Sequence, residues 1–274
     1  MPTTRKEPVV EHTRIGILNL MKNKIETNHN FEHVLRNDEV ELTFYYSATR
    51  YNDRVLDPEI TSTMKPLDLT AIKQFDGFII TGSPVEQLAF EQVTYNQEIN
   101  ELLDKLDELN IPQLYVCWGA MAALNHFYQI RKNILPHKTF GVYQNNIIGE
   151  SYFLRDIENE FPAPHARYAE MNHQDIDMSN ELETKAISEN GLLTLVESTT
   201  KPQLFIFSHL EYPQSGLDDE YQREVNSGKV PEAFPANNYY SPIDNHPMFT
   251  WQETQTQFFN NWLNCVTETK LIKS

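Results

Sequence analysis

The 274-residue chain has few cysteines, no long apolar run and little positive charge. Its two cysteines, Cys117 and Cys265, exclude a disulfide framework and a Cys-x-x-Cys metal site. No apolar run is long enough to span a bilayer, and residues 1–11 lack the apolar core that a secretory signal requires. We therefore expect a cytoplasmic protein that does not associate with a membrane. A reactive thiolate can persist in that reducing compartment.

Basic residues are scarce relative to acidic ones. The chain has 22 Lys and Arg against 39 Asp and Glu, which gives a formal net charge of −17, and the acidic residues are spread along its length. Such a surface repels nucleic acid and anionic membranes, so we expect neither as a partner. A polyanionic cofactor stays compatible with this charge, because a local cluster of cations and backbone donors is enough to bind it.

Strand and helix patterns alternate through the first half of the chain. The segments expected to form strands are 15–20, 40–46, 76–82 and 112–117. The segments expected to form helices are 24–36, 95–110 and the stretch that follows residue 117. This alternation predicts an α/β fold with a doubly wound, mostly parallel sheet that is flanked by helices, and with its site at the carboxyl ends of the strands.

The second half of the chain is less regular. The expected elements there are strands at 141–148, 192–196 and 204–207, a turn or surface segment at 177–190, a loop at 230–247 and a helix at 252–266. No repeat, low-complexity tract or linker divides the chain. We expect a single domain over residues 1–274, with residues 1–12 flexible.

Cys117 occupies the junction between an apolar strand and a segment rich in helix formers that begins at Trp118. A side chain at such a bend lies beside the helix N-terminus, where backbone N–H groups and the macrodipole favour a thiolate. Small residues at 119 and 120 leave space for a substrate. The pattern predicts a nucleophile elbow with sulfur in place of oxygen. A buried structural cysteine is the alternative that this segment alone leaves open.

A second junction follows the apolar run 204–207, which leads to His209 and Glu211. In an extended chain residues i and i+2 point the same way, so the carboxylate could orient the imidazole. With Cys117 they would supply a nucleophile, a base and an orienting acid, although His209 alone could be structural. No second His or Cys stands at ligand spacing from His209, so we expect no metal.

The order of short motifs resembles that of the homoserine O-acyltransferase (transsuccinylase and transacetylase) family over about residues 14–266. The motifs are LNLM (18–21), KIET (24–27), TGSP (81–84), VCW (116–118), GVY (141–143), HARY (165–168), HLEY (209–212) and NWLN (261–264). The resemblance implies a fold like class I glutamine amidotransferases. It also implies ping-pong transfer of an acyl group from acyl-CoA, through a cysteine thioester, to an amino-acid hydroxyl.

The resemblance assigns catalytic roles to four residues. Cys117 matches the acyl-thioester nucleophile, His209 the general base and Glu211 its partner. Lys24 matches a lysine that the family needs for activity, through contact with a CoA phosphate or support of the oxyanion. Acetyl-CoA is then a co-substrate, and no permanently bound cofactor is expected.

Further positions concern substrate binding. Lys138 and Arg223 match substrate-binding residues, and an arginine suits the bidentate binding of an amino-acid carboxylate. Without the resemblance, a surface salt bridge would be the preferred explanation for either cation. Backbone N–H groups at Gly82 and Trp118 are expected to stabilise the oxyanion.

Glu86 matches the position that separates acyl donors in the family. A glycine there leaves room for the longer, charged succinyl group, whereas a glutamate fills that space and repels the succinyl carboxylate. We therefore expect acetyl-CoA as the donor. A solvated loop acid is the alternative interpretation of Glu86.

Departures from the family pattern concern the acceptor. Ala166 replaces the usual serine of a His-Ser-Arg-Tyr motif, and Ser208 and Leu210 replace the usual Gly and Pro around the histidine. The loss of one hydroxyl leaves a polar group of the substrate without its partner and reshapes the pocket. Such a change alters the discrimination between two acceptors by roughly 1–3 kcal/mol. We rank L-serine slightly above L-homoserine, giving O-acetylserine for cysteine biosynthesis or O-acetylhomoserine for methionine biosynthesis.

Two other functions use the same residues. A glutamine amidotransferase or hydrolase would share the Cys and His-x-Glu set, but Tyr115 and Met121 stand where its elbow would have Gly and Gln. A non-catalytic binding protein would not need Cys117, His209 and Glu211 together. The resemblance also implies a homodimer.

Overall fold

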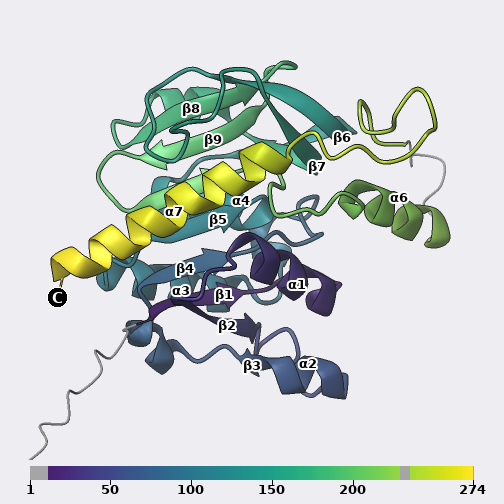
Figure 1. Ribbon diagram of the computed structural model, residues 1–274. Helices are drawn as coiled ribbons and strands as arrows, with labels where there is room; N and C mark the ends of the chain where they lie inside the picture. Colours follow the sequence, from purple (N-terminus) through teal and green to yellow (C-terminus); the bar gives the residue numbers. More distant parts are fainter. Residues whose placement is uncertain (1–11, 229–234, 274) are drawn as a thin grey trace, which may run out of the picture.

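Figure 1 shows the computed structural model, which describes residues 12–228 and 235–273. The predictions for residues 1–11 and for residues 230–234 lie outside the described residues. Within these ranges, the centre of the fold is a ten-stranded sheet in the order β3-β2-β1-β4-β5-β10-β9-β8-β6-β7. No helix in the described ranges is both long and apolar enough to cross a membrane.

The sheet has a parallel half and an antiparallel half. Each neighbouring pair from β3 to β10 is parallel, and each pair from β10 to β7 is antiparallel. The strands are β1 (Thr13–Leu18), β2 (Val40–Tyr46), β3 (Met64–Pro66), β4 (Gly77–Ile80), β5 (Gln113–Val116), β6 (Lys132–Ile147), β7 (Phe161–Met171), β8 (Leu182–Ser188), β9 (Leu193–Ser198) and β10 (Gln203–Ile206).

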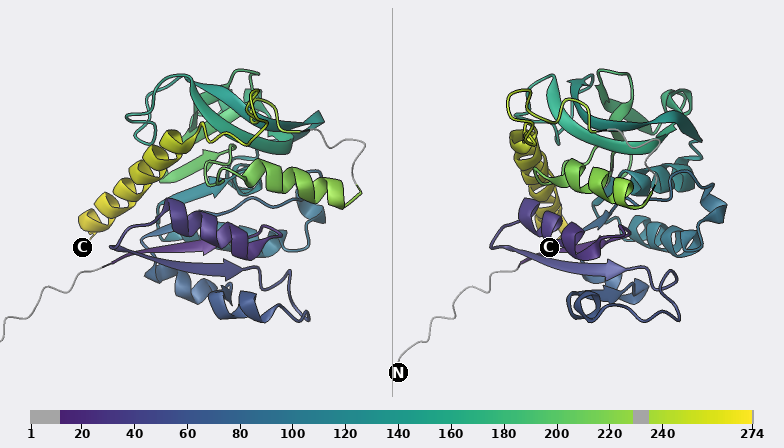
Figure 2. Two further views of the ribbon diagram at one scale, coloured as in Figure 1. Left: turned by 45° about the vertical axis from the view of Figure 1, so that its right-hand side comes forward. Right: turned by 90° about the vertical axis from the view of Figure 1, so that its right-hand side faces the viewer.

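Helices cover both faces of the sheet, as the two views of Figure 2 show. Helices α1 and α7 pack on one face, and α3 and α4 pack on the other. The α-helices are α1 (Lys24–Val34), α2 (Pro58–Thr63), α3 (Asn96–Glu108), α4 (Trp118–Tyr128), α5 (His173–Asp177), α6 (Gly216–Asn226) and α7 (Gln252–Lys273). The part of the chain that the structure describes also contains the short 3₁₀ helices η1 (Leu69–Gln74) and η2 (Phe90–Gln92).

Alternate side chains of the central strands enter different cores. On β5, Leu114 and Val116 join the cluster beneath α1 and α7, whereas Tyr115 joins the cluster beneath α3 and α4. On β10, Ile206 joins the cluster beneath α1 and α7, and Phe205 joins the cluster beneath α3 and α4. Because such strands are buried on both faces, they appear in the sequence as continuous apolar runs.

The expected strands and helices of the first half are present. Segment 177–190 is a correction, because it contains β8, an inner strand between β9 and β6. Leu182 and Ala186 of β8 are buried, while Glu183 is exposed. The acidic appearance of this segment comes from the face of the strand that points away from the core. A strand with one solvated face can carry charges at alternate positions.

Strand β7 and helix α6 were not predicted from the sequence. Strand β7 contains Pro162 and Pro164, residues that usually argue against a strand. It lies at the end of the sheet order, and an edge strand needs to pair on one side only. Helix α6 follows the predicted His-x-Glu segment and carries residues that line a cavity beside Cys117 and His209.

Candidate active site

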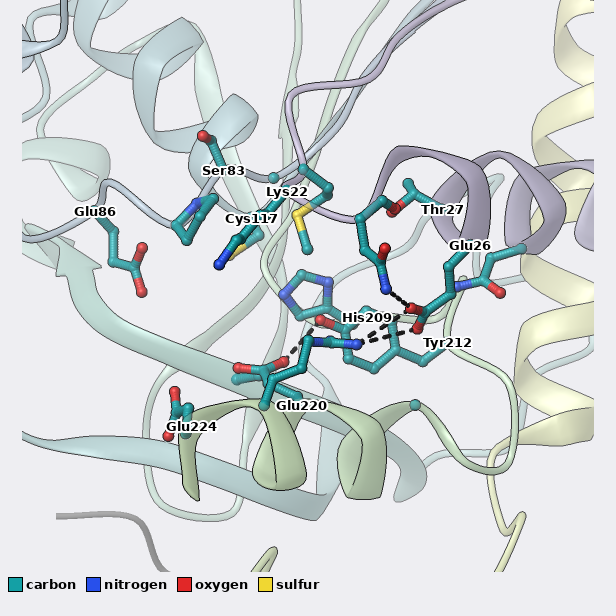
Figure 3. Close-up of a pocket in the computed structure, with 18 of the residues that line it drawn as sticks. Lys22, Glu26, Thr27, Ser83, Glu86, Cys117, His209, Tyr212, Glu220 and Glu224 are labelled. Carbon is teal, nitrogen blue, oxygen red and sulfur yellow. Dashed lines mark hydrogen bonds and ion pairs between the residues drawn. The ribbon is translucent and has the colours of Figure 1, made fainter. Parts of the chain in front are cut away.

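A cavity of about 510 Å³ lies at the carboxyl ends of the parallel strands (Figure 3). The loop after β1, the loop after β4, the bend after β5 and the turn after β10 contribute to its wall, and α1, α6 and β7 complete it. These four strands are neighbours in the sheet, so their carboxyl ends meet at one edge. The predicted residues that line this cavity are Gly82, Glu86, Cys117, Ala166, His209 and Arg223.

Cys117 lies in the bend between β5 and α4. Its φ of 51° and ψ of −112° place a non-glycine residue in a sparsely populated region, which is common at functional bends. The Cys117 N–H donates to the carbonyl oxygen of Ile206 at 2.7 Å, which ties the bend to β10. A Cβ on Gly119 would lie 2.6 Å from the carbonyl oxygen of Ile80, so only glycine lets α4 begin this close to β4.

The imidazole of His209 lies between Cys117 and Glu211. Its Nδ1 is 2.7 Å from Oε1 of Glu211, and its side chain hydrogen-bonds Cys117. Burial by itself opposes the charged imidazole, but the Glu211 carboxylate and the Cys117 sulfur outweigh burial and raise the pKa of His209 well above its ordinary value. A thiol beside an imidazole that a carboxylate orients is a set suited to nucleophilic chemistry.

A turn, and not an extended strand, brings His209 and Glu211 together. Strand β10 ends at Ile206, and the Tyr212 N–H donates to the carbonyl oxygen of His209 at 3.1 Å. The predicted pairing is therefore present, but its predicted cause is corrected. The Tyr212 ring also stacks on the imidazole with 4.5 Å between centroids, a contact that the sequence analysis did not identify.

The backbone of Gly82 passes close to both reactive side chains. A Cβ there would lie 3.3 Å from the Cβ of Cys117 and 3.5 Å from Cε1 of His209. Trp118 is the first residue of α4, where a helix leaves its N–H groups without intrahelical acceptors. In the described ranges, no backbone acceptor is recorded for the N–H of Gly82 or of Trp118.

Glu86 and Ala166 line the cavity from the β4 loop and from β7. Glu86 is only 9% exposed, and this burial raises the pKa of its carboxyl group. A hydrogen bond from the backbone N–H of Glu86 itself and, to a lesser extent, Lys138 and a backbone hydrogen bond from Tyr168 partly oppose this effect of burial on the pKa. Glu86 is therefore a cavity residue and not the solvated loop acid that the sequence left open.

Lys138 contacts the site through two glutamates and does not itself line the cavity. Its Nζ donates to Glu220 and, at 2.6 Å, to Oε1 of Glu224, both of which are cavity residues of α6. Burial opposes the ammonium, but the two carboxylates outweigh burial and raise the pKa of Lys138. The Tyr212 hydroxyl donates to Glu220 at 2.9 Å, which connects this group to the residues around His209.

Arg223 forms an ion pair with Glu26, and both residues line the cavity. Its Nη1 lies 3.2 Å from Oε2 and 3.4 Å from Oε1 of Glu26, a residue in the first turn of α1. The two side chains are 39% and 32% exposed, so solvent reaches both. Glu26 belongs to the KIET motif (24–27), and nothing local in that motif indicates a partner nearly two hundred residues away.

Lys24 is 2% exposed and is not among the residues that line the cavity. Its Nζ donates to the carbonyl oxygens of Asn19 at 2.8 Å and Met21 at 3.1 Å, in the loop that follows β1. Burial, and to a lesser extent Arg50, lowers the pKa of Lys24 to about 7. In this structure the Lys24 side chain holds the loop that follows β1.

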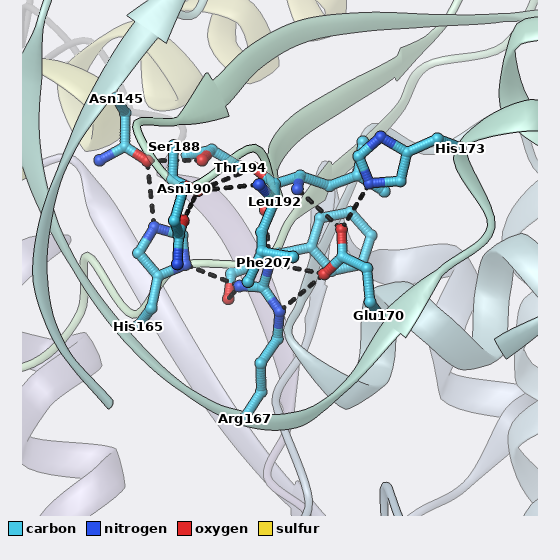
Figure 4. Close-up of polar contacts among 11 residues, drawn as sticks. Asn145, His165, Arg167, Glu170, His173, Ser188, Asn190, Leu192, Thr194 and Phe207 are labelled. Atoms are coloured by element: carbon cyan, nitrogen blue, oxygen red, sulfur yellow. Dashed lines mark hydrogen bonds and ion pairs between the residues drawn. The ribbon is translucent and has the colours of Figure 1, made fainter. Parts of the chain in front are cut away.

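A buried polar network around Arg167 contacts the backbone of Phe207, two residues before His209 (Figure 4). Arg167 is fully buried, and its Nη1 contacts Nδ1 of His165 at 2.6 Å and donates to the carbonyl oxygen of Phe207 at 3.2 Å. Glu170 accepts from Nη2 of Arg167 at 2.7 Å. The HARY motif thus joins β7 to the end of β10. Within the described ranges, no group of three or more His, Cys, Asp or Glu residues is placed to hold a metal ion.

Comparison with known sequences gives one family over nearly the whole chain. The family model described as Homoserine O-succinyltransferase matches residues 3–271. A serine O-acetyltransferase of Lactobacillus acidophilus is 46% identical over 94% of this chain and 97% of its own length. A homoserine O-acetyltransferase of Clostridium tetani is 36% identical over 92% of this chain and 84% of its own length.

Comparison with solved structures shows the fold. A glutamine amidotransferase from Thermotoga maritima superposes with a TM-score of 0.63 at 10% identity, covering 94% of this chain and 99% of that one. The fold is therefore that of the class I glutamine amidotransferase-like proteins, as the sequence resemblance implied. At this identity the likeness concerns the fold alone.

Proposed function

The chain belongs to the homoserine O-succinyltransferase family of amino-acid O-acyltransferases, and on that premise we propose that it transfers an acetyl group from acetyl-CoA to an amino-acid hydroxyl. One observation carries the proposal. Cys117 lies at a strained strand-to-helix bend and is hydrogen-bonded to an imidazole that Glu211 orients, inside a cavity that also holds Arg223. This arrangement can form a thioester and hold an amino acid beside it.

In the first half-reaction, the Cys117 sulfur attacks the thioester carbonyl of acetyl-CoA. The N–H groups of Gly82 and Trp118 stabilise the negative charge that develops on the carbonyl oxygen. The bond between the carbonyl carbon and the CoA sulfur then breaks, and the His209 imidazolium gives its proton to the departing CoA thiolate. The products are free CoA and acetylated Cys117.

In the second half-reaction, His209 acts as the base. Acetylation removes the ionised sulfur that helps to raise the pKa of His209, so the imidazole more readily becomes neutral. Neutral His209 takes the proton of the acceptor hydroxyl, whose oxygen attacks the acetyl carbonyl. The bond to the Cys117 sulfur breaks, which releases the O-acetylated amino acid and restores the thiolate–imidazolium pair.

Two remaining cations support the site at a distance. Lys24 keeps the loop after β1 in place through the carbonyl groups of Asn19 and Met21, so we assign it a positioning role. Lys138 fixes Glu220 and Glu224 and thereby orients α6, on which Arg223 lies. Both roles differ from direct contact with substrate, which the resemblance implied for Lys138 and offered for Lys24.

For the acceptor we propose L-serine, with L-homoserine as the alternative. The smaller side chain of Ala166 in the cavity wall and the 46% identity to a protein named serine O-acetyltransferase support this order. We further propose a single domain, since two cores pack on opposite faces of one sheet. A cytoplasmic location and a homodimer stay predictions from the sequence.

A crossed assay tests the proposed function. Acetyl-CoA and succinyl-CoA are each combined with L-serine and L-homoserine, and thiol release is followed together with the acylated product. We expect the highest kcat/KM for acetyl-CoA with L-serine. Faster turnover of L-homoserine would reverse the acceptor order, and ammonia release from glutamine without any acyl transfer would contradict the proposal as a whole.

Glu86→Gly is expected to admit a longer acyl group. The side chain of Glu86 fills the cavity wall, so its removal should raise kcat/KM for succinyl-CoA by about 10- to 100-fold. Competition between the two acyl-CoA donors measures the change. Glu86→Gln is the matched control, because it removes the charge and keeps the volume. A glutamine variant that gains as much as the glycine variant would show that charge, and not space, excludes the succinyl group.

A further inference from the structure

We propose that Lys132 is a positioning residue for the acyl-donor side of the site: its ammonium group anchors the loop after β4 and thereby keeps Glu86 in the cavity wall. The inference rests on the proposed function, because it concerns the selection of an acyl donor. Lys132 is not among the residues that line the cavity, so it would act through Glu86 and not through contact with substrate.

The loop between β4 and η2 carries two groups of the proposed mechanism. Gly82 lies at its start, and Glu86 extends from it to the cavity (Figure 3). The backbone hydrogen bonds within the loop are local, since the N–H of Val85 donates to Ser83 and the N–H of Leu88 donates to Val85. Bonds of this short range shape a turn but do not fix its position against the rest of the fold. Contacts from other elements are needed for that.

Two contacts join this loop to the paired strands β6 and β7. At the start of β6, the Lys132 ammonium group donates to the carbonyl oxygen of Leu88. The Glu86 carboxylate accepts a hydrogen bond from the backbone of Tyr168 on β7. Because β6 and β7 pair with each other, both contacts fix the loop against the same part of the sheet. Leu88 is only two residues from Glu86, so the contact with Lys132 constrains where Glu86 lies.

Lys132 also contacts the residue with which η2 begins. Its Nζ lies over the ring of Phe90, 4.3 Å from the centroid, and a cation is attracted to the face of an aromatic ring. The Phe90 ring in turn packs against the ring of Trp118, with 6.4 Å between centroids. Trp118 is the first residue of α4. Lys132 therefore holds the end of the loop at two points, and one of them contacts the helix that begins beside the nucleophile.

The half-buried ammonium group of Lys132 has little else to bind. In the part of the chain that the structure describes, Lys132 forms no ion pair, whereas Lys138 forms two. Burial lowers the pKa of Lys132, and the carboxylates of Glu86 and Glu91 partly oppose this effect. A charged group that loses water without gaining an ion pair depends on its remaining polar contacts. The Leu88 carbonyl is the contact of this kind.

The ratio of kcat/KM for butanoyl-CoA to that for acetyl-CoA reports the position of Glu86. Butanoyl-CoA carries a neutral acyl group two methylene groups longer, so the ratio responds to space at the cavity wall. Lys132→Met keeps an apolar side chain over Phe90 but loses the ammonium group. It is expected to raise the ratio by about 3- to 10-fold, the effect of one lost hydrogen bond. Lys132→Arg can still donate to a carbonyl group and lie over a ring, so it should keep the wild-type ratio.

A double variant shows whether Lys132 acts through Glu86. In Glu86→Gly the side chain that closes the wall is absent, so adding Lys132→Met should leave the ratio unchanged. Lys201→Met is the matched control, because Lys201 pairs with Asp107 and does not line the cavity, and it should keep the wild-type ratio. An unchanged ratio in Lys132→Met would overturn the inference, as would an equal rise with and without the Glu86 side chain.

Hydrogen exchange measured by mass spectrometry tests the loop without any acyl transfer. Peptides that contain residues 84–89 should exchange faster in Lys132→Met than in the wild type, and at the wild-type rate in Lys132→Arg and Lys201→Met. Unchanged exchange in Lys132→Met would show that the ammonium group does not hold the loop, which would also overturn the inference. If exchange rises as expected but the wild-type protein transfers no acyl group, the positioning role stands and the proposed function fails.

Discussion

Replacing Cys117 by alanine is expected to abolish acetyl transfer, with a fall in kcat of about 10⁴-fold or more. Alanine keeps the Cβ but has no atom that can carry the acyl group, so neither half-reaction can proceed through a thioester. Intact-mass spectra after incubation with acetyl-CoA, without acceptor, measure the effect directly. The wild-type protein should gain the mass of one acetyl group, and the variant should gain none.

Cys265→Ala is the matched control for Cys117→Ala. Cys265 lies on α7, it is the other of the two cysteines in the sequence, and it does not line the cavity. The Cys265→Ala variant should still form the acetyl adduct and should turn over substrate at the wild-type rate. The free energy of unfolding of the Cys117→Ala variant should lie within about 1 kcal/mol of that of the wild type, because few atoms are lost from the core. Retained turnover in a folded Cys117→Ala protein would contradict the thioester mechanism.

Replacing His209 by asparagine is expected to lower turnover by about 10²- to 10⁴-fold, the range that general acid–base catalysis usually contributes. Asparagine can still form hydrogen bonds but cannot move a proton near neutral pH. Both half-reactions should slow, because His209 donates a proton in the first and accepts one in the second. Rapid-mixing measurement of CoA release, with and without acceptor, separates the two steps.

Glu211→Gln separates the role of charge from that of shape at the same site. The amide keeps a hydrogen-bonding group near Nδ1 but removes the charge that helps to raise the pKa of His209. Burial lowers the pKa of His209, and in this variant only Cys117 would oppose that effect. The pKa of His209 should therefore fall, and the acid limb of the pH–rate profile should move to lower pH. A profile that stays in place would show that Glu211 acts through geometry alone.

The reactive residues could be found from the sequence because each follows an apolar run that predicts a buried strand. Cys117 ends a buried run and begins a helix-forming one, and His209 and Glu211 follow the next apolar run. Parallel strands end at one edge of a sheet, so topology brings these side chains together. The error about how His209 meets Glu211 is local. The sequence predicts extended chain from His209 to Glu211, whereas strand β10 ends at Ile206 and the chain then turns.

The contacts of the cations could not be found in this way. Lys24, Lys138 and Arg223 were identified through the family resemblance. Within the protein, Lys24 contacts carbonyl groups of the loop after β1, and Lys138 contacts two glutamates of α6. Their partners belong to loops and to α6, whose positions depend on how the whole chain packs. Segment 177–190 was misjudged for a related reason, because an inner strand with one solvated face carries the charges of a surface segment.

The sequence by itself determined the fold class, the family and the identity of the thiol, the imidazole and the carboxylate, because strand-to-helix junctions and short motifs are local patterns. Only the tertiary structure decided that Glu26 faces Arg223, that Glu86 is buried in the cavity wall and that Lys24 holds a loop. These facts join α1, α6 and separate strand ends. Such contacts arise from packing between distant segments, which no local pattern records.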